Sequence, residues 1–423
     1  MNAELRDCVA VPVPPGPAGV DALMPALSAA LAGSGPAVAP LPTATSGFAG
    51  YRERILRAVQ PGEPVPEHVA VVAATSGSTG DPAGVLLPES ALRAAASGLC
   101  ARFVAPDGHQ WVAALPLQHA GGLMVAVRSA LTGTEPVAVA SLGGAEPFTV
   151  DALAEATALA RGRSAADGLP LAVSLVPAML AAVDAEGSRG WDLLCEFDLV
   201  LVGGAAAPRE LVDRLLFAGV ALSRSYGMTE TCGGAVFDGR PLPGMSVRTD
   251  PAGRVVLTGD QVALGYRDGR HPDRWAVTED GRRSFRTEDL GSVAADGRVE
   301  VHGRADDIVQ VGGASVSLGA VRAALLADAR VGDAEVVALP DERWGARLVA
   351  LVVHAVEDGP DEPCGAELGA MLAEGVVSSL GPAARPRDVR FISRIPLMES
   401  GKPDRVAVAE LVVGPTPDAD RSR

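Results

Sequence analysis

One short segment of the chain combines glycines with hydroxyl side chains. Residues 75–85 read Thr-Ser-Gly-Ser-Thr-Gly-Asp-Pro-Ala-Gly-Val, directly after residues 68–74, whose apolar character is typical of a buried strand. Glycines let a backbone fold closely around a ligand, and hydroxyl groups donate hydrogen bonds to tetrahedral anions. The alternative is an ordinary Ser/Gly-rich surface loop. We expect a phosphate-binding loop formed by Thr75, Ser76, Gly77, Ser78, Thr79 and Gly80.

A second segment places an aromatic ring, a glycine, a hydroxyl and a carboxylate close together. Residues 225–231 read Ser-Tyr-Gly-Met-Thr-Glu-Thr. Glu230 could hold Mg²⁺, because this ion prefers few protein carboxylates combined with substrate phosphate oxygens. The alternative is that Tyr226 packs in the core and Glu230 is a solvated charge at the start of a helix.

Lysine occurs once in this chain. Lys402 is the single lysine among 36 basic residues, so arginine serves nearly everywhere that a positive charge is needed. An ammonium group is a compact charge on a flexible stem, suited to reaching one oxygen of a reacting carboxylate or phosphate. Lys402 is therefore a candidate catalytic residue, and a lysine surviving at random on the surface is the alternative.

The composition limits the classes of protein to be considered. The 423 residues carry a formal net charge of -16, which repels nucleic acid and anionic lipid, so an anionic ligand requires a local site. No apolar run reaches the roughly 18 residues of a membrane span, and the N-terminus lacks the pattern of a secretory signal. Five cysteines without CxxC spacing argue against disulfides and zinc. We expect a cytoplasmic protein with small-molecule ligands, and a homo-oligomer remains open.

The elements that position these residues predict an α/β fold. Strand patterns at residues 171–175 and 199–202 precede helical patterns at 178–185 and 208–217, which indicates parallel strands with crossover helices. After about residue 250, short strands separated by turn pairs predict a small β-rich antiparallel subdomain.

The domain boundaries follow from the change of pattern along the chain. We expect a large N-terminal domain over residues 1–305 and a small, mobile α+β domain over residues 306–413. Residues 414–423 hold prolines and charges that bury little apolar surface, so we expect a disordered tail.

These segments resemble, in their order, the adenylate-forming superfamily of acyl-CoA synthetases, luciferases and peptide synthetase adenylation domains. The loop of that superfamily reads TSGSTGxPKG, and residues 75–84 read TSGSTGDPAG. Ala83 thus replaces a lysine that contacts the phosphates of ATP, which implies slower adenylation or its loss. The resemblance implies an acid–thiol ligase that uses ATP and Mg²⁺ to form an acyl adenylate and passes the acyl group to coenzyme A.

Three motifs of the superfamily imply a nucleotide pocket. Residues 225–231 resemble YGxTE, in which the Tyr stacks on adenine, the Thr meets the α-phosphate and the Glu binds the metal. Residues 203–207 resemble an adenine-pocket segment, and residues 285–291 resemble (Y/F)RTGD, whose Asp binds the ribose hydroxyls, with Glu288 in place of the usual glycine. These roles fall on Tyr226, Thr229, Glu230, Gly204, Ala205 and Asp289.

Two further motifs imply a mobile C-terminal domain. Residues 303–306 resemble the GRxD hinge, so Arg304 would contact ribose and Asp306 would be the pivot. Residues 396–405 resemble PxxxxGK, whose lysine, here Lys402, bridges the carboxylate and the α-phosphate during adenylation. Rotation about the pivot would then bring residues 311–314, with Gly312 and Gly313, to the site and open a path for the pantetheine of CoA.

The acid is less closely specified by the sequence. The short chain and residues 226–245 resemble o-succinylbenzoate-CoA ligases of menaquinone biosynthesis. His119 lies where the family places a residue at the acyl pocket wall, and Arg128 could pair with a second carboxylate of the substrate, although both side chains could equally be structural. The alternatives are a diverged ligase or thioesterifying half-enzyme for another aryl or acyl acid, and a non-catalytic nucleotide-binding relative.

Overall fold

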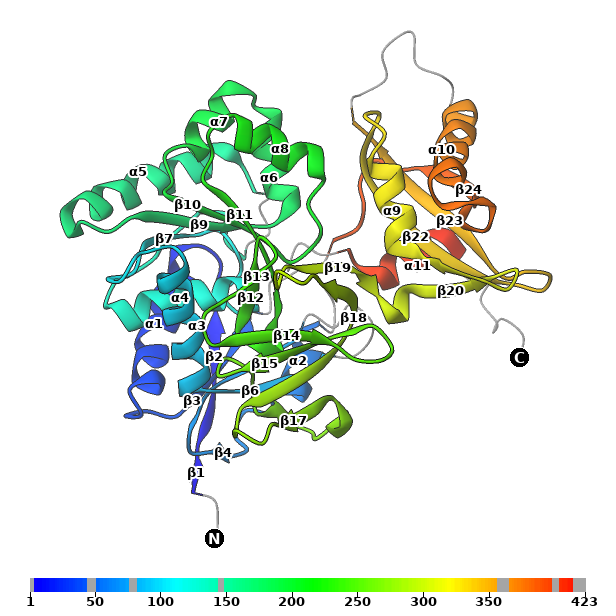
Figure 1. Ribbon diagram of the computed structural model, residues 1–423. Helices are drawn as coiled ribbons and strands as arrows, with labels where there is room; N and C mark the ends of the chain where they lie inside the picture. Colours follow the sequence, from blue (N-terminus) through cyan, green and yellow to red (C-terminus); the bar gives the residue numbers. More distant parts are fainter. Residues whose placement is uncertain are drawn as a thin grey trace, which may run out of the picture.

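The protein forms a large body followed by a smaller one (Figure 1). The computed structural model describes residues 4–43, 51–75, 82–143, 148–355, 365–397 and 403–413. The fold is α/β, as the sequence predicts, but its large sheets are mixed rather than parallel. Within the described ranges no helix combines the length and apolar character needed to cross a membrane.

The first large sheet leads into the predicted phosphate loop. Strands β2 (Cys8–Val13), β3 (Ala37–Pro42) and β5 (Val69–Ala74) lie side by side and are parallel, whereas β6 (Gly84–Pro88) is antiparallel to β5 and β16 (Gly265–Tyr266), at the edge, is antiparallel to β6. All residues of β3 and β5 are buried, because both faces of this sheet are covered, which explains the continuous apolar runs. In spatial order the strands are β16, β6, β5, β3 and β2.

The second large sheet has a parallel part and an antiparallel edge. Only a 3₁₀ turn, η1 (Thr229–Thr231), and Cys232 separate β11 from β12, which is too short for a parallel crossover. This connection is why the sheet departs from the predicted parallel arrangement. In spatial order the strands are β13 (Arg240–Pro241), β12 (Gly233–Phe237), β11 (Leu222–Met228), β10 (Leu199–Val202), β9 (Leu171–Leu175), β7 (Gln110–Ala113) and β8 (Val137–Ala138).

Helices cover both large sheets. The helices α1 (Pro17–Leu31), α3 (Glu89–Arg102) and α4 (Ala120–Thr132) share one core with strands of both sheets. The outer face of the first sheet packs against α2 (Tyr51–Val59). The outer face of the second sheet carries α5 (Val150–Asp167), α6 (Pro177–Ala185), α7 (Ser188–Leu194) and α8 (Arg209–Phe217).

A smaller antiparallel sheet follows, as predicted for the region after residue 250. Its longest strand, β18 (Arg283–Val293), pairs with three others. The remaining strands are β14 (Met245–Thr249), β15 (Arg254–Gly259), β17 (Trp275–Val277) and β19 (Val299–Arg304), with η2 (Pro272–Arg274) before β17; β1 (Leu5–Arg6) pairs separately with β4 (Val65–Pro66).

The residues after β19 build a sheet and core of their own. Apolar side chains of α9 and α10 cover one face of this sheet and those of α11 the other. The boundary at residue 305 stays a prediction, and the tail at residues 414–423 lies outside the described residues. The elements are η3 (Ala305–Asp307), β20 (Ile308–Val311), β21 (Ala314–Ser317), α9 (Leu318–Leu326), β22 (Val331–Asp341), β23 (Gly345–His354), α10 (Gly365–Leu380), η4 (Pro382–Ala384), β24 (Pro386–Phe391) and α11 (Arg405–Val413).

Candidate active site

Strands from two sheets bring the predicted adenine and ribose residues together. The hydroxyl of Tyr226, on β11, donates a hydrogen bond of 2.6 Å to Oδ2 of Asp289, on β18. Asp289 is paired with Arg304 across β18 and β19, and Nη1 of Arg304 lies 3.8 Å from Oδ1 of Asp289. Burial, together with the charge of Asp289, raises the pKa of Tyr226, so the phenol stays protonated and acts as the donor.

Arg304 joins this group to the predicted hinge. Its Nε and Nη2 donate to Oδ1 and Oδ2 of Asp306 at 2.7 and 2.6 Å. Burial opposes charge on both groups, but their mutual hydrogen bonds and attraction raise the pKa of Arg304 and lower the pKa of Asp306. The predicted ribose ligands and the predicted pivot therefore form one ionic network.

The predicted metal ligand lies in the 3₁₀ turn after β11. Glu230 is 8% exposed, and its Oε1 accepts a hydrogen bond of 2.6 Å from the hydroxyl of Tyr266 on β16. The main-chain carbonyl of Glu230 accepts a 2.9 Å bond from the amide of Ala263. Thr229, the residue before Glu230, is also buried. Burial raises the pKa of the Cys232 thiol, which follows the turn, to about 12, so this thiol is unreactive.

The donor set around Glu230 fits magnesium better than a transition metal. No group of three or more His, Cys, Asp or Glu side chains gathers into a metal site in the part of the chain that the structure describes. Mg²⁺ needs no such cluster, because it takes one or two carboxylates and completes its shell with water and phosphate oxygens.

The ends of the predicted phosphate loop are held together. The amide of Thr75 donates to the carbonyl of Ala83 at 2.8 Å, and the amide of Ala83 donates to Oγ1 of Thr75 at 2.9 Å. Ala83, which replaces the family lysine, is 5% exposed and packs in the core shared by the two sheets. The other predicted loop residues, Ser76, Gly77, Ser78, Thr79 and Gly80, lie outside the described residues.

The predicted adenine-pocket segment lies against the strand that carries Tyr226. Gly203 follows β10, and a Cβ atom at this position would meet Oγ of Ser225 at 2.2 Å, so a larger residue there would require the Ser225 side chain to move. Gly204 has a φ of 84°, a conformation that glycine adopts without strain, and the following Ala205 is exposed. The structure thus places Gly203, the residue before Gly204 and Ala205, against Ser225, the residue before Tyr226.

The two predicted acyl-pocket residues lie apart. His119 is the N-cap residue of α4, and its Nε2 lies 3.4 Å from the hydroxyl of Tyr51 on α2. Arg128 lies nine residues further along α4, about 13 Å at 1.5 Å per residue. Its guanidinium is buried 5.2 Å from the ring centre of Trp111, and burial lowers the pKa of Arg128 to about 10. The structure therefore does not bring Arg128 to His119.

The C-terminal candidates are only partly described. Lys402 lies outside the described residues, but both sides of its segment are fixed, by a bridge between Leu397 and Pro403 and by Arg405. Arg405 donates two hydrogen bonds, of 2.5 and 2.7 Å, to the buried carboxylate of Asp307 in the predicted hinge. Gly312 and Gly313 form the tight turn between β20 and β21, with φ values of 58° and 84°.

Comparison with known proteins identifies the family. The AMP-binding enzyme family matches residues 21–272, and the AMP-binding enzyme C-terminal domain matches residues 321–402. The chain belongs to the AMP-binding enzyme family. It is 38% identical over 395 residues to a probable 2-succinylbenzoate–CoA ligase of Mycobacterium tuberculosis, an alignment that covers 93% of this chain and 95% of the relative.

Two other relatives show the breadth of this family. A sulfoacetate–CoA ligase of Cupriavidus necator is 29% identical, with 81% of this chain and 67% of the relative covered. The structure of the o-succinylbenzoate coenzyme A synthetase of Bacillus subtilis, in complex with ATP and magnesium ion, is 20% identical with a TM-score of 0.71, covering 95% of this chain and 89% of that one. The sulfoacetate–CoA ligase shows that relatives of this chain are named for different acids, and the solved structure shows the fold.

One departure from the motifs of AMP-binding enzymes has a structural explanation. Glu288, which replaces the glycine before Asp289, is 17% exposed in its side chain and pairs with Nε of Arg254 at 3.2 Å and Nη2 of Arg274 at 2.6 Å. These two arginines come from β15 and η2, so the added charge is neutralised and ties β18 to its neighbours.

Sequence reasoning missed two tyrosines at this site. Tyr51 contacts His119, and Tyr266 contacts Glu230. Neither tyrosine lies in one of the motifs from which the site was predicted. The available signal was rarity: the chain holds only three tyrosines, and all three contact predicted site residues.

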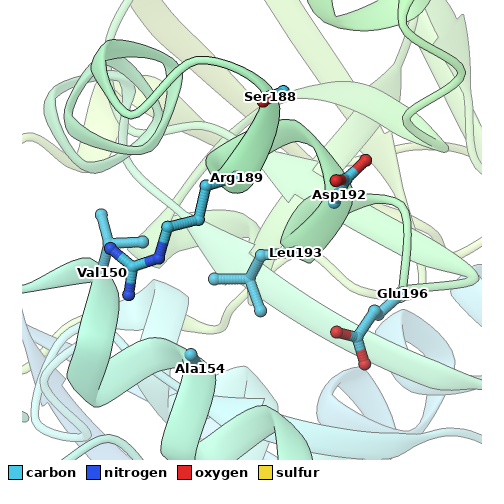
Figure 2. A pocket seen from close by; sticks show the side chains of 7 residues that line it. All are labelled: Val150, Ala154, Ser188, Arg189, Asp192, Leu193 and Glu196. Atoms are coloured by element: carbon cyan, nitrogen blue, oxygen red, sulfur yellow. The ribbon is translucent and has the colours of Figure 1, made fainter.

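A separate hollow of about 410 Å³ lies between α5 and α7 and contains none of the predicted site residues (Figure 2). Arg189 in this hollow is already ion-paired with Asp151 and Glu186. The lining residues are Val150, Ala154, Ser188, Arg189, Asp192, Leu193 and Glu196.

Proposed function

We propose that this AMP-forming acid–CoA ligase activates o-succinylbenzoate and converts it to o-succinylbenzoyl-CoA. Membership of the family supports the reaction class, and 38% identity along 93% of the chain to the mycobacterial relative supports the acid. In the structure, the observation that carries the proposal is the Tyr226–Asp289 hydrogen bond, which joins the predicted adenine and ribose ligands from two different sheets.

The first half-reaction joins two anions. A carboxylate oxygen of the acid bonds to the α-phosphorus of ATP, and the bond from that phosphorus to pyrophosphate breaks. Glu230 would hold Mg²⁺, which neutralises phosphate charge when it is bound. Thr229 would donate to an α-phosphate oxygen, and Lys402 would contact the carboxylate and the α-phosphate, which offsets their repulsion in the transition state.

The nucleotide would be held mainly by the large body. The Tyr226 ring and the backbone of Gly204 and Ala205 would flank adenine, and residues 75–80 would surround the phosphates. Asp289 suits the ribose, because its two oxygens accept hydrogen bonds from adjacent hydroxyls, while Arg304 contributes charge nearby.

In the second half-reaction, the thiol of CoA must reach the acyl adenylate at the position that Lys402 occupies in the first. The CoA sulfur bonds to the acyl carbon, the bond from that carbon to the AMP oxygen breaks, and the thiol proton passes to solvent. We infer that residues 306–413 turn as a domain about Asp306, which withdraws Lys402 and brings the Gly312–Gly313 turn to the pantetheine path. A side chain at Gly312 would meet the ring of Trp344 at 2.8 Å, so the turn must stay small.

A second candidate function is a diverged ligase, or a thioesterifying half-enzyme, for another acid. Two observations favour it: Ala83 is buried where the family has a lysine, and Arg128 lies in the core rather than beside His119. A non-catalytic nucleotide-binding protein has less support, because the chain retains Lys402, Glu230 and Asp289 together.

Mass spectrometry of the products tests these functions directly. The purified protein is incubated with ATP, Mg²⁺, CoA and either o-succinylbenzoate or a panel of aryl and fatty acids. We expect o-succinylbenzoyl-CoA and AMP. A thioester of another acid alone would favour the diverged ligase, and a thioester only from supplied acyl adenylate would favour the half-enzyme.

A further inference from the structure

The three tyrosines of the chain share an unusual placement. Each hydroxyl lies within hydrogen-bonding distance of a predicted site residue: Tyr51 at 3.4 Å from His119, Tyr226 at 2.6 Å from Asp289, and Tyr266 at 2.6 Å from Glu230. Tyr226 has a role of its own in the nucleotide pocket. Tyr266 has none, yet its hydrogen bond is equally short and both partners are at most 9% exposed.

We propose that Tyr266 is a positioning residue that orients the Glu230 carboxylate for the metal ion of the ATP complex. The inference rests on the proposed adenylation and assigns to it a residue outside the predicted motifs. A carboxylate at the end of a glutamate side chain rotates about its last bond, so a donor fixed on Oε1 limits the directions in which the carboxylate presents its lone pairs.

The ring of Tyr266 is itself held in place. It makes edge-to-face contacts with Trp275 at 5.3 Å and 83°, and with Phe285 at 6.4 Å and 85°. His271 packs at 6.2 Å and 75°. Because aromatic side chains have few rotamers, a ring packed on these sides leaves its hydroxyl in one position.

The backbone around Tyr266 connects Glu230 to the phosphate loop. The amide of Ala263 donates to the Glu230 carbonyl at 2.9 Å, while Tyr266 pairs with Val85 on β6, the strand that leaves the loop. The amide of Arg267 donates to the carbonyl of Gly84 at 2.8 Å. Residues 263–267 thus hold the main chain of the metal ligand, its side chain and the base of the loop in one arrangement.

The decisive variant is Tyr266→Phe, which removes the hydroxyl and keeps the ring. The affinity of α,β-methylene ATP is measured by calorimetry without acid or CoA, once with Mg²⁺ and once with EDTA. We expect the Mg²⁺-dependent gain in affinity to fall about 10- to 100-fold, the range for loss of a residue that supports a metal ligand. The affinity in EDTA should stay within twofold of the wild type.

Two further variants separate the hydroxyl from packing. In Trp275→Leu, one contact that holds the ring is removed while the hydroxyl and the Phe285 contact remain, so the Mg²⁺-dependent gain should fall less than in Tyr266→Phe. A 4-fluorophenylalanine at position 266 fills the hydroxyl's space without donating a proton, and should reproduce the loss even if Tyr266→Phe folds poorly.

The outcomes distinguish this inference from the proposed function. An unchanged Mg²⁺-dependent gain in the Phe and 4-fluorophenylalanine variants would overturn the role of Tyr266, as would an equal loss with Mg²⁺ and with EDTA. If the wild type fails to bind the nucleotide under either condition, the proposed function itself fails. In a Glu230→Gln background the hydroxyl should contribute no further metal dependence, and a full additional loss would contradict the proposal.

Discussion

Two parts of the candidate site hold their side chains by different chemistry. On the nucleotide side, Tyr226 and Tyr266 donate from packed rings to Asp289 and Glu230. At the predicted hinge, Arg304 pairs with Asp306, and both side chains are more than a third exposed. Removing a phenol donor from a largely buried carboxylate costs a hydrogen bond that water does not readily replace, whereas a half-exposed ion pair exchanges its partners with water at little cost. The nucleotide side is therefore preorganised and the hinge is suited to rearrangement.

Lys402→Ala should have the largest effect and tests whether the two parts serve different steps. We expect the rate of acyl adenylate formation to fall at least 10²- to 10³-fold, because a charge that acts on the transition state is lost. Release of pyrophosphate measures this rate. Thioester formation from supplied acyl adenylate should change far less. Lys402→Arg is the matched control for charge, and equal losses in both half-reactions would contradict a turning C-terminal domain.

Asp289→Asn should weaken AMP binding by about 10- to 100-fold, because hydrogen bonds to an ionised acceptor contribute about 1.5 to 3 kcal/mol. Calorimetry with AMP measures this without any reaction. Glu288→Gln is the control, since that side chain pairs with Arg254 and Arg274 instead. Comparable losses in both variants would mean that the shape of β18, rather than the Asp289 carboxylate, determines nucleotide affinity.

Arg405→Gln weakens the ionic contacts of the hinge and should cost stability rather than nucleotide affinity. Asp307 would lose two hydrogen bonds, but Arg405 is 37% exposed and screened by solvent, so we expect a loss of about 1 to 2 kcal/mol instead of the 3 to 5 typical of a fully buried pair. Urea unfolding measures the difference, which should shrink at high salt. Arg385→Gln, which breaks an exposed pair with Glu374, should cost close to nothing.

Local sequence patterns predicted the order of the elements better than their mutual arrangement. The strand before residue 75 and the antiparallel region after residue 250 follow from apolar runs and turn pairs. The antiparallel edge at β12 depends on the length of one connection, and the Tyr266–Glu230 contact joins residues 36 positions apart. No local pattern encodes such a contact, although the scarcity of tyrosine in the chain was an available signal.

The position of Arg128 favours a structural role for this side chain, and its role at the acyl pocket stays a prediction. Nine residues separate it from His119, which is two and a half turns at 3.6 residues per turn, so the two side chains point to opposite sides of α4. Arg128 consequently faces Trp111 in the core, and its Nε has no hydrogen-bond partner among the described residues.

Arg128→Met should therefore have the smallest effect on catalysis. The KM for the acid should stay within about twofold. The free energy of unfolding should be equal to or above that of the wild type, because a buried cation that has no acid partner among the described residues is costly and methionine fills a similar volume. Burial lowers the pKa of Arg128 to about 10, so its charge opposes folding at neutral pH, and this cost falls only above pH 10. Loss of the cation–π contact with Trp111 acts against the gain. A raised KM for dicarboxylic acids alone, with monocarboxylic acids unaffected, would return Arg128 to the acyl pocket and make α4 the element that reads the substrate's second charge.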